Sequence, residues 1–162
     1  MRNLFSVIVL ILLTVPALIS CAGSGQSGER EYVFRSNIGN ATEIDMQRLI
    51  PRYISRINFV LYRDNVTLEG TYFETEWRER ALFDDEIELG ATQARNMIII
   101  SSRSPTGQVS LAHRAQIEIY NQVYIPDEGG WVRYVSTPQA EEYFRDISRR
   151  LAQELESGVR NF

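Results

Sequence analysis

The chain has 162 residues, and its 21 acidic residues outnumber 17 basic ones, which gives a formal net charge of −4. An acidic chain is a poor electrostatic match for nucleic acid or for an anionic lipid surface, so we expect no nucleic-acid partner. Every basic residue is arginine, which excludes Schiff-base and P-loop lysine chemistry, and a single cysteine excludes an intramolecular disulfide.

The first 21 residues have the pattern of a secretory signal peptide. Arg2 precedes an apolar run at 4–19, and small residues follow that run. A membrane-spanning helix needs about 20 apolar residues, so the run is too short for the usual retained anchor. The signal ends in Leu18-Ile19-Ser20-Cys21, which resembles the lipobox of bacterial lipoproteins.

The lipobox resemblance implies that the chain is cut between Ser20 and Cys21 and that Cys21 carries covalent lipid, with no other cofactor. Ala22 in place of aspartate favours the outer membrane under the enterobacterial sorting rule. Small and polar residues then form a linker of the flexible type. We therefore expect a lipoprotein signal peptide at 1–20, the lipidated cysteine and linker at 21–31, and one domain at 32–162.

The first half of the domain predicts a strand at 32–35 and a helix with Thr42 as its N-cap. One apolar face of that helix comprises Met46, Leu49, Ile50, Tyr53, Ile54 and Ile57. Pro51 interrupts it, so the helix either bends there or begins near Leu49. Asp64-Asn65 predicts a turn between strands at 59–62 and 66–77.

The second half predicts a polar connection at 78–94, a buried strand at 97–100, a turn at 104–107 and an alternating strand at 109–123. A turn at 126–130 leads to a last strand at 131–135. The final helix has Thr137 as its cap and Pro138 in its first turn, and Gly158 ends it. Its apolar face comprises Ala140, Phe144, Ile147, Leu151 and Leu155.

These elements predict an α+β fold with the order β-α-β-β-β-β-α. The two amphipathic helices need an apolar surface to cover, and one face of an antiparallel sheet supplies it. The prediction is a two-layer sandwich, with four to five strands covered on one face by two helices.

Three sets of residues are candidate sites. His113 is the only histidine and shares its phase with Val109, Leu111 and Ala115, so we expect it to face the helices, in the core or on a pocket wall. No G-x-S-x-G sequence accompanies it. The acidic cluster is typical of a solvated loop and is a weak metal candidate; it comprises Asp84, Asp85, Glu86 and Glu88. An aromatic and arginine-rich set suggests an interface, or ordinary core residues; it comprises Tyr72, Trp77, Arg78, Arg80 and Trp131.

The order of elements at 32–157 is similar to the helix-grip domains of envelope-assembly lipoproteins, namely the component C lipoprotein of the β-barrel assembly machinery and the lipoprotein that plugs the lipopolysaccharide transport barrel. The resemblance implies a non-enzymatic, periplasm-facing accessory module that binds an envelope protein or lipid in outer-membrane assembly or maintenance. One alternative is a module that binds a small ligand, lipid or lipopolysaccharide between helices and sheet. Another is a carboxylate-based hydrolase that uses the acidic loop.

Overall fold

The computed structural model describes residues 32–67, 70–103, 112–133 and 136–159. Their elements, in chain order, are β1 (Val33–Ala41), α2 (Glu43–Arg56), β2 (Leu61–Thr67), β3 (Gly70–Thr75), β4 (Arg78–Arg80), α3 (Asp84–Glu88), β5 (Gln93–Arg103), β6 (His113–Ile125), the 3₁₀ turn η1 (Pro126–Glu128), β7 (Gly130–Val132) and α4 (Pro138–Val159). The α+β class is as predicted. The predicted strand count and order are wrong, because the sheet has seven strands and a third helix lies between β4 and β5.

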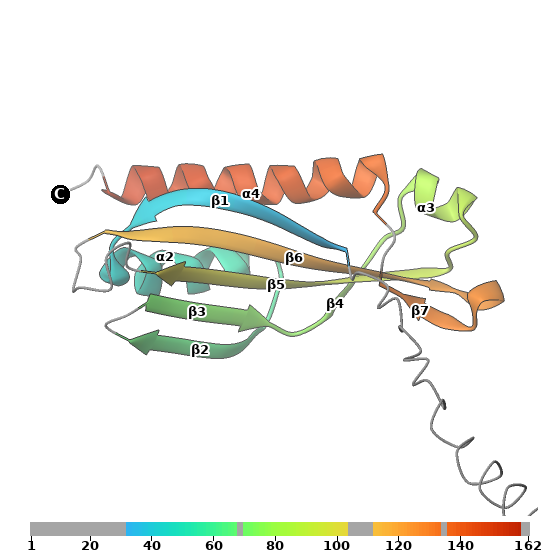
Figure 1. The fold of residues 1–162 in the computed structure, drawn as a ribbon, viewed down its shortest axis with the longest axis horizontal. Coiled ribbons are helices and arrows are strands. Elements are labelled where there is room, and N and C mark those ends of the chain that lie inside the picture. Colours follow the sequence, from blue (N-terminus) through green and yellow to red (C-terminus); the bar gives the residue numbers. More distant parts are fainter. Residues whose placement is uncertain (1–31, 68–69, 104–111, 134–135, 160–162) are drawn as a thin grey trace, which may run out of the picture.

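The sheet is antiparallel at every recorded pairing and has the order β1-β6-β5-β3-β2. β5 and β6 form its long central pair (Figure 1). They extend past the ends of β3 and β1, and there β4 pairs with β5 and β7 pairs with β6. Of the other described strands, β1, β3, β4 and β7 each pair with β5 or β6. β2 does not, and it pairs with β3 instead.

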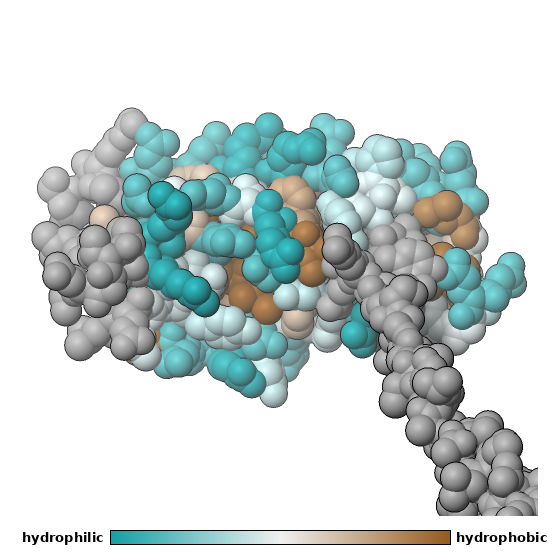
Figure 2. Space-filling model, viewed as in Figure 1, coloured by the Kyte–Doolittle hydropathy of each residue, from teal (hydrophilic) through white to brown (hydrophobic). Residues whose placement is uncertain are grey.

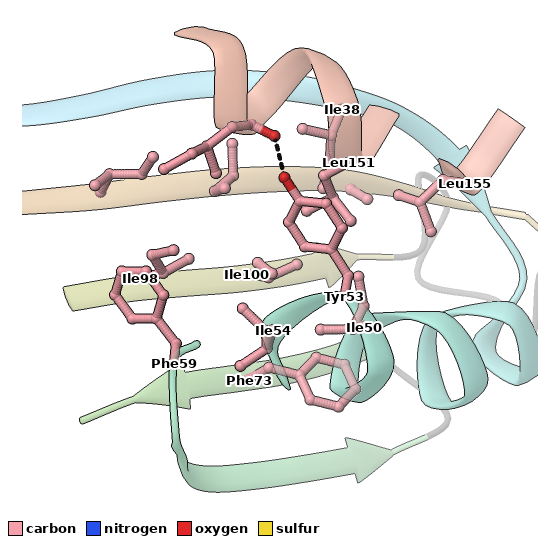
Figure 3. Packing of buried hydrophobic residues seen from close by; sticks show 14 of the residues in the cluster. Ile38, Ile50, Tyr53, Ile54, Phe59, Phe73, Ile98, Ile100, Leu151 and Leu155 are labelled. Atoms are coloured by element: carbon pink, nitrogen blue, oxygen red, sulfur yellow. Dashed lines mark hydrogen bonds between the residues drawn. The ribbon is translucent and has the colours of Figure 1, made fainter. Parts of the chain in front are cut away.

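The main hydrophobic core lies between one face of the sheet and the helices α2 and α4 (Figure 3). It includes Ile38, Phe73, Ile98, Ile100, Ala115, Ile117 and Ile119 from the strands, and Met46, Ile50, Tyr53, Ile54, Ala140, Phe144, Ile147, Leu151 and Leu155 from the helices. The Tyr53 hydroxyl donates a hydrogen bond of 2.7 Å to the Ile147 carbonyl. This buried bond joins the two helices.

Both long helices begin at threonine caps, as predicted. The Thr42 Oγ1 atom accepts a hydrogen bond of 3.1 Å from the Asp45 N–H, and the Thr137 Oγ1 atom accepts one of 3.3 Å from the Ala140 N–H. A helix start near Leu49 is wrong, because α2 continues through Pro51. Buried residues lie on both sides of the proline, and their burial offsets the backbone hydrogen bond that proline cannot make.

Several predicted strand boundaries are wrong. Asp64 and Asn65 lie inside β2 rather than in a turn, because an edge strand with exposed side chains needs no apolar pattern. The predicted strand at 66–77 is divided between β2 and β3. The segment 78–94 contains β4 and α3, and α4 passes Gly158 to end at Val159. The turn at 104–107, Val109 and Leu111 lie outside the described residues.

A second, smaller apolar cluster fills the β4–β7 end of the sheet and comprises Ala91, Ala94, Val123, Ile125 and Val132. Within the described residues, no helix has the length and apolar character needed to cross a membrane.

Candidate functional site

The sheet face opposite α2 and α4 carries the candidate site, and we call it the open face. Side chains alternate between the two faces along a strand. Ile98 and Ile100 are buried on the helix-facing side, so the residues that alternate with them lie on the open face. On β5 these are the odd-numbered residues 95–103, and on β6 they are the even-numbered residues 114–124. Figure 2 shows hydrophobic side chains gathered near the middle of this face, with hydrophilic ones around them.

Trp77, Arg95 and Trp131 form an aromatic clamp at one end of the open face. The Arg95 guanidinium carbon lies 4.0 Å from the centroid of the Trp131 ring and 4.9 Å from that of Trp77. Its Nε atom donates a hydrogen bond of 2.8 Å to the Gln122 side-chain oxygen. The Trp131 ring also meets Tyr124 edge-on, with ring centroids 5.6 Å apart. Burial lowers the pKa of Arg95 below its ordinary value, and the charge of Arg133 adds to this effect.

The middle of the open face is apolar. Met97 and Ile99 are half-buried there, and Val33 and Tyr120 pair across neighbouring strands beside them. This strip is bounded by a row of charged residues that neutralise one another. Arg63 lies 3.9 Å from Glu74 on one side of Ile99, and Arg35 lies 3.2 Å from Glu118 on the other.

The structure separates the aromatic and arginine-rich set. Trp77 and Trp131 meet in the clamp, while Tyr72 lies farther along the open face. The Tyr72 hydroxyl donates a hydrogen bond of 3.0 Å to Glu74, and burial together with that carboxylate raises the pKa of the phenol. The β4–β5 register pairs Arg78 with Asn96 and Arg80 with Ala94, which places both arginines on the helix-facing side.

Arg78 and Arg80 contact residues at the edge of the main core, and Arg78 is half-buried there. The Arg78 guanidinium carbon lies 4.3 Å from the centroid of the Phe59 ring, and its Nη2 atom donates a hydrogen bond of 3.1 Å to the Tyr143 hydroxyl. The guanidinium also donates to the Ile57 carbonyl. These contacts tie β4 to the ends of both long helices.

The acidic cluster forms helix α3 rather than a solvated loop. Glu86 is fully buried and accepts two hydrogen bonds from Arg80, one of them 2.8 Å long. Arg80 also donates to Asn121, which accepts a further bond of 3.2 Å from Asn96. The Asp85 carboxylate accepts a bond of 3.0 Å from the Gln139 N–H, while Asp84 and Glu88 are exposed.

The four acidic side chains therefore do not converge on one point. In the described ranges, no group of three or more histidine, cysteine or acidic side chains is placed to hold a metal ion. The buried polar network of Arg80, Glu86, Asn96 and Asn121 instead lies between the two apolar clusters.

His113 is buried on the helix-facing side, as its phase predicted, with 2 % of its surface exposed. Its Nδ1 atom lies 3.4 Å from the Ser102 hydroxyl, which lies 2.8 Å from the Thr71 hydroxyl. The Ser102 oxygen also accepts a hydrogen bond from the Thr71 N–H. Because all three side chains are buried, this arrangement satisfies polar groups at the end of the core and presents no nucleophile to solvent.

Arg95 is the site residue that sequence reasoning missed. Arg95 falls between the predicted polar connection at 78–94 and the predicted strand at 97–100, although it shares the alternation of Met97 and Ile99. That alternation, extended toward the N-terminus by one step, was the available signal. Ser20 and Cys21 lie outside the described residues.

Comparison with known proteins gives no further assignment: no protein-family model matches the chain, and no curated protein sequence matches it.

Proposed function

We propose that the protein is a lipid-anchored, non-enzymatic lipoprotein of the bacterial envelope whose open face docks a protein partner in outer-membrane assembly or maintenance. The lipid on Cys21 supplies the anchor, and residues 22–31 supply the tether. The domain faces the periplasm. Docking by the aromatic clamp and the apolar strip of Met97 and Ile99 is the function that the geometry supports best.

The single observation that carries this proposal is the position of Arg95 between Trp77 and Trp131 on a sheet face that no described helix covers. Tryptophan and arginine are enriched among the residues that dominate binding energy at protein interfaces. Stacking on both rings also fixes the Arg95 side chain before a partner arrives, so less conformational entropy is lost on binding.

Charge favours a protein over an anionic lipid as the occupant of the strip of Met97 and Ile99. The pairs Arg63–Glu74 and Arg35–Glu118 neutralise the row beside Ile99, so the strip offers no excess positive charge to lipid headgroups. An apolar strip between neutralised charges and two tryptophans is typical of a protein interface, with an apolar centre and a polar rim.

The arrangement of α2 and α4 on one face of the sheet fits a two-layer sandwich and supports the resemblance to helix-grip envelope lipoproteins. In such a sandwich the uncovered sheet face is the broad surface left for a partner. The resemblance rests on the lipobox and on the placement of the two long helices, so we carry over no binding residue from that class of protein.

Photo-crosslinking in intact envelopes tests the proposal. A photoreactive amino acid at Ile99 is expected to yield one dominant protein adduct. The same amino acid at Gln153, which is exposed on α4, is the matched control and is expected to yield none. Equal adduct patterns at both positions, or no adduct at Ile99, would contradict docking on the open face.

A further inference from the structure

Two arginines lie directly opposite each other at the other end of the open face. The β5–β6 register pairs Arg103 with Arg114, and both side chains are exposed (Figure 1 shows the two strands). Side chains at such paired positions have Cβ atoms about 4.5–5.5 Å apart, and like charges there repel each other. The β5–β6 register therefore places two like charges opposite each other at this position.

Within the described residues, neither guanidinium has a carboxylate counter-charge. Among the residues that the structure describes, no carboxylate lies within ion-pair distance of Arg103 or Arg114. The row that crosses β5 and β6 at Ile99 and Glu118 differs, because Arg63 and Arg35 each have a glutamate partner there. Two positive charges are thus left without a counter-charge beside a row in which every charge has one.

The arginine pair lines a hollow of about 310 Å³ in the open face. Its other polar lining residues include Asn37, Ser101 and Gln116, which are neutral. Glu118 is the one carboxylate in the lining, and it already accepts hydrogen bonds from Arg35, Gln116 and Tyr120. The hollow therefore offers two positive charges and several neutral hydrogen-bonding groups.

A second hollow of about 240 Å³ shares Ser101, Ser102 and Arg103 with the first. It adds Asn65, Thr67 and Tyr72, and its lining contains no acidic residue. Arg103 consequently borders two recesses, both lined mainly by neutral polar groups. This distribution suits a ligand that carries its negative charge at the arginine pair and uncharged polar groups on either side.

We propose that Arg103 and Arg114 bind a phosphate group. The planar guanidinium matches phosphate oxygens with two parallel hydrogen bonds, and two guanidiniums side by side suit a dianion. The bound phosphate would also remove the repulsion between the two arginines. The group could belong to a lipid headgroup or to a soluble phosphate compound, and the two sources share this chemistry. The site lies at the opposite end of β5 from the aromatic clamp and does not depend on the proposed protein partner.

The test measures binding to the full-length lipidated protein in phosphate-free, non-ionic detergent micelles at low salt. The two probes are inorganic phosphate and dihexanoyl phosphatidic acid, and dihexanoyl phosphatidylcholine is the control lipid. Saturable binding of either probe, with a rise in the unfolding temperature, supports the site. A tenfold preference for phosphatidic acid would assign the headgroup as the source, and equal or tighter binding of inorganic phosphate would assign the soluble one.

Arg103→Gln and Arg114→Gln are each expected to weaken binding tenfold or more, since each removes a charged pair of hydrogen bonds. Arg63→Gln is the matched control, because it removes an exposed arginine of the same face that already has a carboxylate partner. The Arg63→Gln variant is expected to bind phosphate with unchanged affinity. The proposal would be overturned if the unsubstituted protein bound neither probe, or if both glutamine variants bound the probes with unchanged affinity.

A second measurement needs no ligand. In phosphate-free buffer, Arg103→Gln is expected to leave the unfolding midpoint equal or raised, because it relieves the repulsion across β5 and β6. A clear fall in the midpoint would show that the pair is structural and would count against a ligand site. Adducts at Ile99 are expected to be unaffected in this variant, so failure of the phosphate site and failure of partner docking remain distinguishable.

Discussion

Arg80 and Glu86 form a two-pronged ion pair that is closed off from solvent, with side chains 5 % and 0 % exposed. The pair lies on the helix-facing side of the sheet, between the main core and the smaller cluster at the β4–β7 end. Glu86 also accepts a hydrogen bond of 3.1 Å from the Phe83 N–H, and the Arg80 guanidinium carbon lies 4.4 Å from the centroid of the Phe83 ring. The ion pair thus holds α3 against the sheet.

Glu86→Gln is expected to lower the free energy of unfolding by about 3–5 kcal/mol, because it leaves the Arg80 charge buried without a counter-charge. Urea denaturation measures the loss. Glu79→Gln on β4, next to Arg80, is the control, since Glu79 is exposed, and its effect is expected to stay within about 0.5 kcal/mol. A loss below about 1 kcal/mol for Glu86→Gln would show that water reaches the pair.

Because the Tyr53 phenol is buried, we expect the protein to lose stability at alkaline pH. Burial raises its pKa from 10.0 to about 12. The unfolded chain therefore releases this proton at a lower pH than the folded protein does, and the stability from the neutral phenol is fully present below pH 10 and is lost as pH rises from 10 to 12. The loss is on the order of 2 kcal/mol.

Urea denaturation at a series of pH values measures this effect. Tyr53→Phe is expected to flatten the dependence between pH 10 and 12, although it lowers stability near neutral pH by about 1 kcal/mol through loss of the bond to the Ile147 carbonyl. An unchanged slope in this variant would assign the alkaline loss to other tyrosines.

Thr137→Ala is expected to destabilise the protein by about 1 kcal/mol, because the Ala140 N–H loses its acceptor at the start of α4. Thr137→Ser keeps a hydroxyl at the cap and is expected to recover most of that loss. The thermal unfolding midpoints of the two variants provide the measurement. Equal midpoints would mean that the cap hydroxyl contributes nothing.

The aromatic clamp contains both tryptophans of the chain, so tryptophan fluorescence reports on it directly. Arg95→Met is expected to shift the tryptophan emission and to reduce the yield of the partner adduct at Ile99 severalfold. The free energy of unfolding is expected to fall by about 1 kcal/mol. Arg133→Met, an exposed neighbour, is the control. An adduct that persists at full yield would place the partner elsewhere on the molecule.

Cys21→Ser tests the anchor. With no thiol to receive lipid, the variant is expected to accumulate as uncut precursor in the inner membrane, which gel mobility and membrane fractionation detect. Normal cleavage and release of this variant would show that the lipobox is not used.

The sequence predicted well those elements in which burial follows a regular spacing. The face of α4 from Ala140 to Leu155 and the alternation of β6 from Ala115 to Ile119 each point to one core, and the threonine caps mark where the helices begin. These features are local, so a single chain segment contains the whole signal.

The sequence could not predict β4, because its helix-facing residues are Arg78 and Arg80 rather than apolar side chains. An arginine is buried there only because Glu86 approaches from α3, and that pairing depends on the tertiary fold. The clamp has the same origin, since Trp77, Arg95 and Trp131 come from three separate segments that meet only when β4, β5 and β7 are in register.

The place of β1 sets an order of events for folding. Arg35 pairs with Glu118, which lies 83 positions later in the sequence, and β1 is enclosed between β6 and α4, the last of the described elements. During synthesis, the first of the described strands therefore has neither of these two neighbours until most of the described residues have emerged. Because pairing between strands so far apart in the sequence must first close a long loop, we expect the β1–β6 pairing to form late in folding.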